Sequence, residues 1–217
     1  MKKFFIVAAA LVLSASAAMA QDYLRLQASF VSNKMTNIDD PFEIKPGGVN
    51  FGGVAGFLVS DNLPIYLEPG LNISWSHSAK DFNDGAQEIK FTYMSAAIPL
   101  NGVYKYDLND KVAVSGFFGF NFKANFMAKE HDKGFVNPIV GKKNYSWLSK
   151  KDMGDRDNRA NIFQFGSQVG AGFHVSRFYI GYQFQWDWMK FQEFDIVGYD
   201  SDAHKWVSNY ITVGYTL

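Results

Sequence analysis

Hydrophobic and polar residues alternate with a period of two over long stretches of this chain. The clearest stretch covers residues 178–188, where one side is wholly apolar and ends in Trp186 and Trp188. The other side carries tyrosine, glycine, amides and the carboxylate of Asp187. Successive side chains of a β-strand point to opposite faces, so a period of two indicates a strand. These residues therefore predict a strand with one apolar face and one mainly polar face.

The same alternation recurs along the chain and predicts eight strands. The alternating segments are 24–30, 49–59, 65–75, 88–107, 112–126, 163–175, 178–188 and 207–217. In the fourth segment Ile89, Phe91 and Tyr93 share an apolar face, but the pattern loses its register near Pro99. Proline cannot donate to the strand ladder, so we expect a β-bulge at this point.

Short and long connections alternate strictly between the predicted strands. The short ones are 60–63, 108–110 and 176–177, and the long ones are 34–47, 77–87, 128–160 and 191–204. Strands that run up and down then place all short turns at one end, as transmembrane barrels do on their periplasmic side. We therefore predict an eight-stranded antiparallel up-and-down transmembrane β-barrel over residues 21–217, with both termini periplasmic. An open sheet would leave backbone groups unpaired in lipid.

Aromatic residues gather where a barrel would meet the two membrane surfaces. Outer-membrane barrels carry such aromatic girdles at both interfaces. Near the long loops lie Trp75, Trp186, Trp188 and Trp206, and near the short turns lie Tyr23, Tyr104, Tyr106, Tyr179 and Tyr215. Phe184 falls between these levels, so we expect it to face lipid.

The first twenty residues are typical of a secretory signal peptide. Lys2 and Lys3 precede the apolar run 4–13, and the small-x-small sequence Ala18-Met19-Ala20 follows. The alternative is an N-terminal membrane anchor, but this run is too short to span a bilayer. We expect cleavage after Ala20 and export to the cell outer membrane.

Composition narrows the possible chemistry. The chain has 217 residues, with 21 Lys and Arg against 21 Asp and Glu. Removing Lys2 and Lys3 leaves 19 basic against 21 acidic residues, a net charge of −2 that implies no nucleic-acid partner. The absence of cysteine excludes disulfides and every thiolate-based site.

The last predicted strand carries a family resemblance. With the strand layout, residues 209–217 resemble the small eight-stranded outer-membrane barrels of the OmpX and OmpA transmembrane type. The resemblance implies that Ile211, Val213, Tyr215 and Leu217 form the insertion signal read by the barrel assembly machinery. The family usually ends in an aromatic residue, and Leu217 departs from that pattern. The expected partners are this machinery and outer-membrane lipids, including lipopolysaccharide, and the expected state is a monomer.

The inner face of the predicted barrel carries charged residues. Its ionisable side chains are Arg25, Glu68, Lys90, Lys123, His174 and Asp187. An eight-stranded barrel is just wide enough for side chains to fill, and an unpaired charge there is costly. From their levels along the strands we predict two lumen ion pairs, Arg25 with Glu68 and Lys123 with Asp187.

Candidate catalytic and ligand motifs are weak. His174-Val175-Ser176 has the His-x-Ser spacing of outer-membrane lipid A deacylases, but it adjoins a short turn and so lies at the wrong end. His77, His131 and His204 have no convincing serine and carboxylate nearby. The acidic residues 152–157 do not fit a calcium loop, and residues 134–143 do not fit a phosphate loop. We expect no catalytic residue, metal or cofactor.

The long connection 128–160 carries eight basic residues against five acidic ones. Such an excess could contact lipopolysaccharide phosphates or an acidic host surface. The leading hypothesis is a non-enzymatic structural or adhesion-type envelope protein acting through its extracellular loops. The alternatives are a porin-like small-solute channel, a lipid-modifying enzyme and a soluble lipocalin-like carrier. The carrier would bury Phe184 inside its barrel.

Overall fold

The computed structural model describes residues 22–36, 45–60, 62–82, 86–134, 143–153, 159–192 and 204–217, so the predicted leader lies outside the described part. Its elements are β1 (Tyr23–Met35), β2 (Gly47–Ser60), β3 (Leu63–Phe82), β4 (Gln87–Asn109), β5 (Val112–Lys133), β6 (Asn144–Ser146), α2 (Lys150–Met153), β7 (Phe163–Val175), β8 (Phe178–Asp187) and β9 (Trp206–Thr216). Within these residues no helix is long and apolar enough to cross a membrane.

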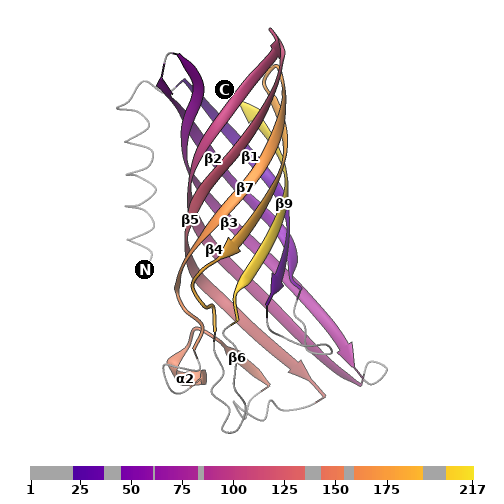
Figure 1. The fold of residues 1–217 in the computed structure, drawn as a ribbon. Coiled ribbons are helices and arrows are strands. Elements are labelled where there is room, and N and C mark those ends of the chain that lie inside the picture. The colour runs from indigo at the N-terminus through magenta and orange to yellow at the C-terminus, as the bar shows by residue number, and fades with distance from the viewer. Residues whose placement is uncertain are drawn as a thin grey trace.

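The strands close into a barrel with steeply tilted strands (Figure 1). Neighbours in the ring are β1-β2-β3-β4-β5-β7-β8-β9, and every pair is antiparallel. The last strand returns to the first, with partners from Arg25↔Thr216 to Met35↔Trp206. The predicted eight-stranded antiparallel up-and-down barrel is confirmed. The ninth strand, β6, is a short addition to the outer end of β5.

Short turns join the strands at one end only. They lie between residues 60 and 63, 109 and 112, and 175 and 178. In the second turn the side-chain oxygen of Asn109 accepts the backbone N–H groups of Lys111 and Val112 at 2.9 and 3.0 Å. The start of β1 and the end of β9 lie at this same end, opposite β6 and α2 (Figure 1). This end is the periplasmic one in the predicted orientation.

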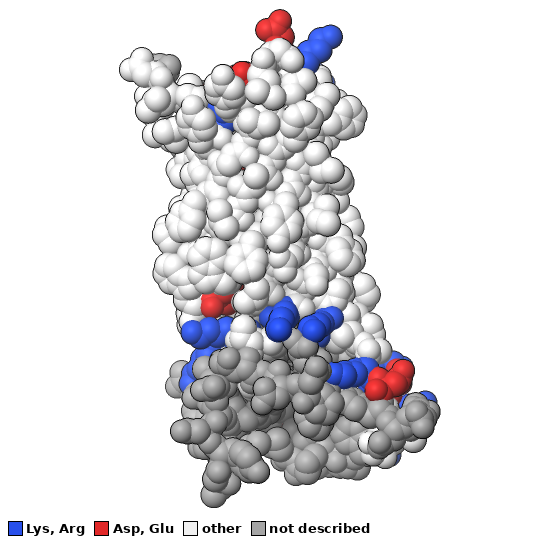
Figure 2. Space-filling view, turned by 45° about the vertical axis from the view of Figure 1, so that its right-hand side comes forward, with Lys and Arg blue, Asp and Glu red and all other residues white. Residues whose placement is uncertain are grey.

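The outer wall is apolar and the interior is polar, as the alternation predicts. Ile180 and Tyr182 on β8 are more than half exposed, whereas Gln185 and Asp187 on the same strand are 1% and 4% exposed. In Figure 2 a broad band around the middle shows no charged side chain, and charges gather towards both ends. A soluble protein would have the reverse arrangement. The wall therefore suits a lipid environment.

Three strands extend further than predicted. The segments 77–82 and 128–133, expected to be loops, are strand, and β3, β4 and β5 continue beyond the other strands at the long-loop end (Figure 1). The predicted bulge near Pro99 is wrong, since Pro99 stays paired with Asn121. The register shift lies instead where Met94 and Ser95 face Met127 and Asn125, which leaves Phe126 of β5 as the extra residue. The pattern changes in β4 because its apolar side moves from the outer wall to the interior.

Candidate functional site

The structure brings Arg25 and Glu68 together in the lumen near the short-turn end. Arg25 Nη2 lies 3.1 Å from Glu68 Oε2, and both side chains are almost fully buried. The Tyr23 hydroxyl donates to the other oxygen of Glu68. The Arg25 guanidinium lies 4.0 Å from the centre of the Tyr179 ring, a cation–π contact. Each charge is thus compensated within the barrel.

Lys123 and Asp187 form a second buried pair at a higher level of the lumen. Lys123 Nζ lies 2.5 Å from Asp187 Oδ2, and the other carboxylate oxygen accepts from Gln185 at 3.1 Å. The two residues stand on β5 and β8, with β7 between them. Gly166 of β7 faces Asp187, where a Cβ would meet Asp187 Oδ1 at 2.9 Å. The absence of a side chain at Gly166 leaves room for the Asp187 carboxylate, which Lys123 contacts across β7.

Amide side chains fill the space between the two ion pairs. Gln168 donates to Asn101 at 2.5 Å and accepts from Gln183 at 3.0 Å, while Asn121 donates to Gln185 at 2.7 Å. A cavity of about 20 Å³, roughly the space of one water molecule, remains beside Arg25 and Glu68. Hydrogen-bonded side chains therefore fill much of the described lumen.

The prediction that Tyr23 and Tyr179 belong to the aromatic girdle near the short turns is wrong, because both side chains point into the lumen. Tyr179 is buried in the lumen, and its side chain lies across Gly172 and Gly181, where an added Cβ would meet a ring carbon and the hydroxyl oxygen, respectively, at about 2.1 Å. Tyr23 likewise points inward to Glu68. Tyr179 belongs to the inner set of β8, so strict alternation already indicated this. Tyr104 and Tyr106 do face outward, at 50% and 55% exposure.

The remaining predicted wall residues lie outside the barrel. Trp75, Trp188 and Tyr215 are exposed on the wall, and the Phe184 and Trp186 rings lie 5.7 Å apart on it, half-buried by neighbours. Ile211, Val213 and Leu217 are also exposed, on and just after the strand that closes the ring on β1. The carrier alternative required Phe184 to be inside, which the structure contradicts.

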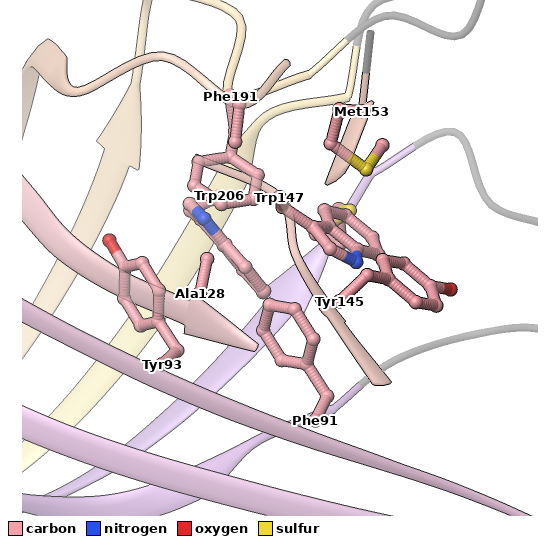
Figure 3. Packing of buried hydrophobic residues seen from close by; sticks show 10 residues of the cluster. Phe91, Tyr93, Ala128, Tyr145, Trp147, Met153, Phe191 and Trp206 are labelled. Carbon is pink, nitrogen blue, oxygen red and sulfur yellow. The ribbon is translucent and has the colours of Figure 1, made fainter. Parts of the chain in front are cut away.

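An apolar cluster fills the barrel above the polar lumen, and we call it the outer cup. Its members are Met35, Phe91, Tyr93, Ala128, Tyr145, Trp147, Met153, Ala160, Phe191 and Trp206. Figure 3 shows wall rings meeting rings from the long connection, with Phe91 and Trp147 centred 5.0 Å apart. Trp206 is 1% exposed here, so its predicted place in the outer girdle is wrong. Phe91 and Tyr93, expected outside, also point inward.

Sequence reasoning missed the outer cup because half of it comes from a predicted loop. Tyr145 and Trp147 belong to residues 143–153, which we call the lid segment. The backbone N–H of Trp147 donates to the Ala128 carbonyl at 2.8 Å, and β6 pairs with β5 from Lys129↔Ser146 to His131↔Asn144. The aromatic residues of the long connection were the available signal.

Two carboxyl groups lie buried beneath the lid segment. Glu130 and Asp132 occupy successive inward positions of β5 and are 7% and 0% exposed. Burial, with a smaller contribution from the Asp132 charge, raises the pKa of Glu130 to about 7, although the Tyr145 hydroxyl that donates to it opposes this shift. Burial also raises the pKa of Asp132. The outward neighbours Lys129, His131 and Lys133 are exposed.

The histidines do not assemble a triad in the described part of the chain. Nε2 of His174 lies 2.9 Å from the Ser115 hydroxyl, so its partner is not Ser176. Among the described residues, no carboxylate is hydrogen-bonded to that ring. His77 contacts Thr92 and His204 contacts the Thr36 carbonyl. The described residues also contain no group of three potential metal ligands. Residues 155–158, part of the segment that did not fit a calcium loop, lie outside the described residues. Lys90 pairs with Glu88 at 2.9 Å rather than in the lumen.

A closed antiparallel barrel with an apolar wall and a polar, filled lumen is an outer-membrane barrel. The chain belongs to the outer membrane protein beta-barrel domain family, whose sequence model matches residues 5–176. The family places the protein in the outer membrane, as expected. A search of curated protein sequences found no match.

A search of solved structures found similarity to outer-membrane barrels at low sequence identity and TM-scores below 0.5. Ail of Yersinia pestis, in complex with the heparin analogue sucrose octasulfate, is 12% identical, with coverage of 90% of this chain and 99% of Ail and a TM-score of 0.44. Neisserial surface protein A is 10% identical, with coverages of 88% and 96% and a TM-score of 0.45. The outer membrane enzyme PagL is 9% identical, with coverages of 87% and 98% and a TM-score of 0.48. These likenesses concern the fold alone.

Proposed function

We propose that this protein is a non-enzymatic structural or adhesion-type protein of the outer membrane that acts through its extracellular part. The observation that carries the proposal is a filled lumen combined with a sheet of β3, β4, β5 and β6 that continues beyond the membrane wall. Such a sheet presents side chains to the surroundings, and the hydrogen-bonded lumen side chains favour an extracellular role over transport.

The exposed surface of this extension carries a more positive net charge than its amino-acid composition suggests. Exposed lysines on and after β5 include Lys129, Lys133, Lys143, Lys150 and Lys151. Glu130 and Asp132, which would offset them, are buried. In Figure 2 basic side chains gather between the uncharged band and the long-loop end. A cationic rim of this kind attracts polyanions, either an acidic host surface or the phosphates of lipopolysaccharide.

Lipid and assembly partners complete the proposal. Outer-membrane lipids contact the apolar wall, and the barrel assembly machinery recognises the strand that contains Ile211, Val213, Tyr215 and Leu217. We further propose a cleaved leader over residues 1–20 and a monomeric state. A closed ring in the described residues supports the monomer, because it leaves no barrel strand edge in the membrane for a second copy.

Adhesion can be tested with charge variants at opposite ends. Lys129, Lys133 and Lys143 are replaced by Gln in one variant, and Lys105, Lys111 and Arg177 at the short-turn end are replaced by Gln in its control. Cells displaying the full chain are then bound to immobilised heparin, a sulfated polyanion. We expect weaker binding of the first variant and unchanged binding of the control. Equal binding of all three proteins would contradict an adhesive role of the rim.

Vesicles with and without lipopolysaccharide separate the two sources of anionic groups. If lipopolysaccharide phosphates are the partner, reconstituted protein is more resistant to unfolding in vesicles that contain it, and the rim variant loses that gain. If only heparin binding changes, the partner is an acidic surface.

The channel and enzyme alternatives have their own tests. A large and steady conductance of the purified protein in a planar bilayer would contradict the filled lumen and favour a porin-like channel. Release of fatty acids from outer-membrane lipids by the protein, abolished in Ser115→Ala, would favour a lipid-modifying enzyme.

A further inference from the structure

Among the described residues, the lid segment is attached to the barrel mainly through contacts with β5. Three residues of β6 pair with β5, and Tyr145 and Trp147 insert into the outer cup. Within the segment, Asp152 accepts the Ser146 N–H at 3.0 Å. These contacts close the cup from outside (Figure 3). The attachment of the lid segment therefore depends on the wall that carries Glu130 and Asp132.

Glu130 and Asp132 face the lid segment rather than solvent. Glu130 is opposite Phe91 of β4, and Asp132 is opposite Ile89, so the pair has apolar neighbours on that side. The Tyr145 hydroxyl donates to Oε1 of Glu130. Among the described residues, the oxygens of Asp132 have no hydrogen-bond partner other than the neighbouring Glu130 carboxyl. Two adjacent buried carboxyl groups of this kind cannot both be ionised without a large cost.

The surrounding charges do not neutralise the pair. The charged and titratable groups of the packed elements are Glu88 and Lys90 of β4, Lys129, His131 and Lys133 of β5, Tyr145 of β6, and Lys143, Lys150, Lys151 and Asp152 of the lid segment. The Lys143 carbonyl accepts the Asp132 backbone N–H at 2.7 Å, and the Lys143 residue is exposed. Lys90 is paired with Glu88, and the three β5 groups stand on the opposite, exposed face. No salt bridge to Glu130 or Asp132 is formed by any of these described residues. Protons are then the available means of removing the charge.

We propose that Glu130 and Asp132 form a proton-operated clasp, which holds the lid segment over the outer cup when protonated and releases it when ionised. Release exposes the apolar floor formed by Phe91, Tyr93 and Trp206 while the polar lumen below stays filled. The clasp is independent of the adhesive role, because it concerns the inner face of the extension.

The direction of the pH effect follows from the two states. In the docked state the pKa of Glu130 is about 7, and that of Asp132 is also raised, whereas a released carboxyl returns to its ordinary value near 4.5. The docked state therefore binds more protons than the released state. Docking is fully favoured below the released pKa, weakens as pH rises, and is weakest above about pH 7.

Hydrogen exchange in the whole protein in phospholipid nanodiscs tests the clasp. Protection factors, corrected for the intrinsic pH dependence of exchange, are measured for amides of residues 144–153. We expect protection to be about tenfold or more higher at about pH 5 than at about pH 8. In Glu130→Gln/Asp132→Asn the protection should be high at both pH values. Glu88→Gln, which neutralises the acid of β4 that is paired with Lys90, should behave as wild type.

Two outcomes would overturn the clasp. One is lid protection in the wild type that does not change with pH, and the other is an unchanged pH dependence in the double variant. Heat-modifiable migration verifies that each variant has closed its barrel. Should the double variant fail to fold, Asp132→Asn alone must show a smaller pH dependence than wild type, and an equal dependence overturns the proposal as well.

Discussion

The membrane wall and the extension above it use the same strands with opposite faces. Low on β4, Ile98 and Leu100 point outward and Asn101 points into the lumen. High on β4, Phe91 and Tyr93 point inward, and the side chain of Lys90 is 43% exposed. The difference teaches that the surrounding solvent decides which face is apolar: lipid requires an apolar exterior, and water an apolar interior.

The two strands make this change differently. β4 keeps its alternation, and only its inward residues change, from small or polar residues such as Ser95, Ala97 and Asn101 to the rings of Phe91 and Tyr93. β5 inserts Phe126, so its inward positions switch from Lys123 and Asn125 to Ala128 and Glu130. A bulge shifts the alternation by one residue. The bulge thereby turns Ala128 and Glu130 inward, where strict alternation would have pointed them outward.

The largest expected effect comes from removing one partner of a lumen charge pair. Lys123→Met leaves Asp187 buried without its cation and should destabilise the barrel by about 3–5 kcal/mol. Urea unfolding in phospholipid vesicles measures the loss. The matched double variant Lys123→Met/Asp187→Leu should recover much of it. Similar stability of the single and double variants would show that the Asp187 charge does not need Lys123 to compensate it.

A charge placed on the lipid-facing wall should be next in size. Phe184→Arg is expected to cost about 2–4 kcal/mol, as for an arginine near the bilayer midplane. Ala79→Arg, on the exposed outer face of the extension, should change stability by no more than about 0.5 kcal/mol. The same unfolding assay measures both variants. An equal loss of stability in Phe184→Arg and Ala79→Arg would contradict the distinction between a lipid-facing wall and a water-facing extension.

Glycines test how tightly the lumen is filled. In Gly172→Ala the new Cβ would lie 2.1 Å from the Tyr179 ring, so the ring must move, at a cost of about 1–3 kcal/mol. Gly116→Ala on the outward face of β5 meets nothing within 4 Å and should be close to neutral. A neutral Gly172→Ala in vesicle unfolding would mean that the lumen adapts easily.

The smallest effect concerns the lid segment. Tyr145→Phe removes the hydroxyl that donates to Glu130 and should weaken docking of the segment by about 1–2 kcal/mol. Exchange protection of residues 144–153 should fall while that of β8 stays unchanged. Tyr104→Phe on the outer wall is the control and should alter neither. A loss that extends to β8 would show that cup and lumen unfold as one unit.

Most of the barrel could be predicted from local pattern, and part of the lumen followed from it. Alternation placed Arg25, Glu68, Lys123 and Asp187 on one face, and turn positions gave their levels. The cup could not be predicted in this way, because its rings come from strands and from a connection with no period. Tyr179 shows a different error: its inward position was visible in the alternation, but its proximity to a turn suggested a girdle.

The sequence by itself determined the strand number, the up-and-down order and the apolar wall, because each depends on spacing within a single strand or turn. Only the tertiary structure decided which side chains meet across the barrel. Lys123 and Asp187 stand two strands apart in the ring, and Phe91 meets Trp147 from the lid segment. Such contacts depend on curvature and closure of the sheet, which bring distant residues together and leave no periodic mark in the chain.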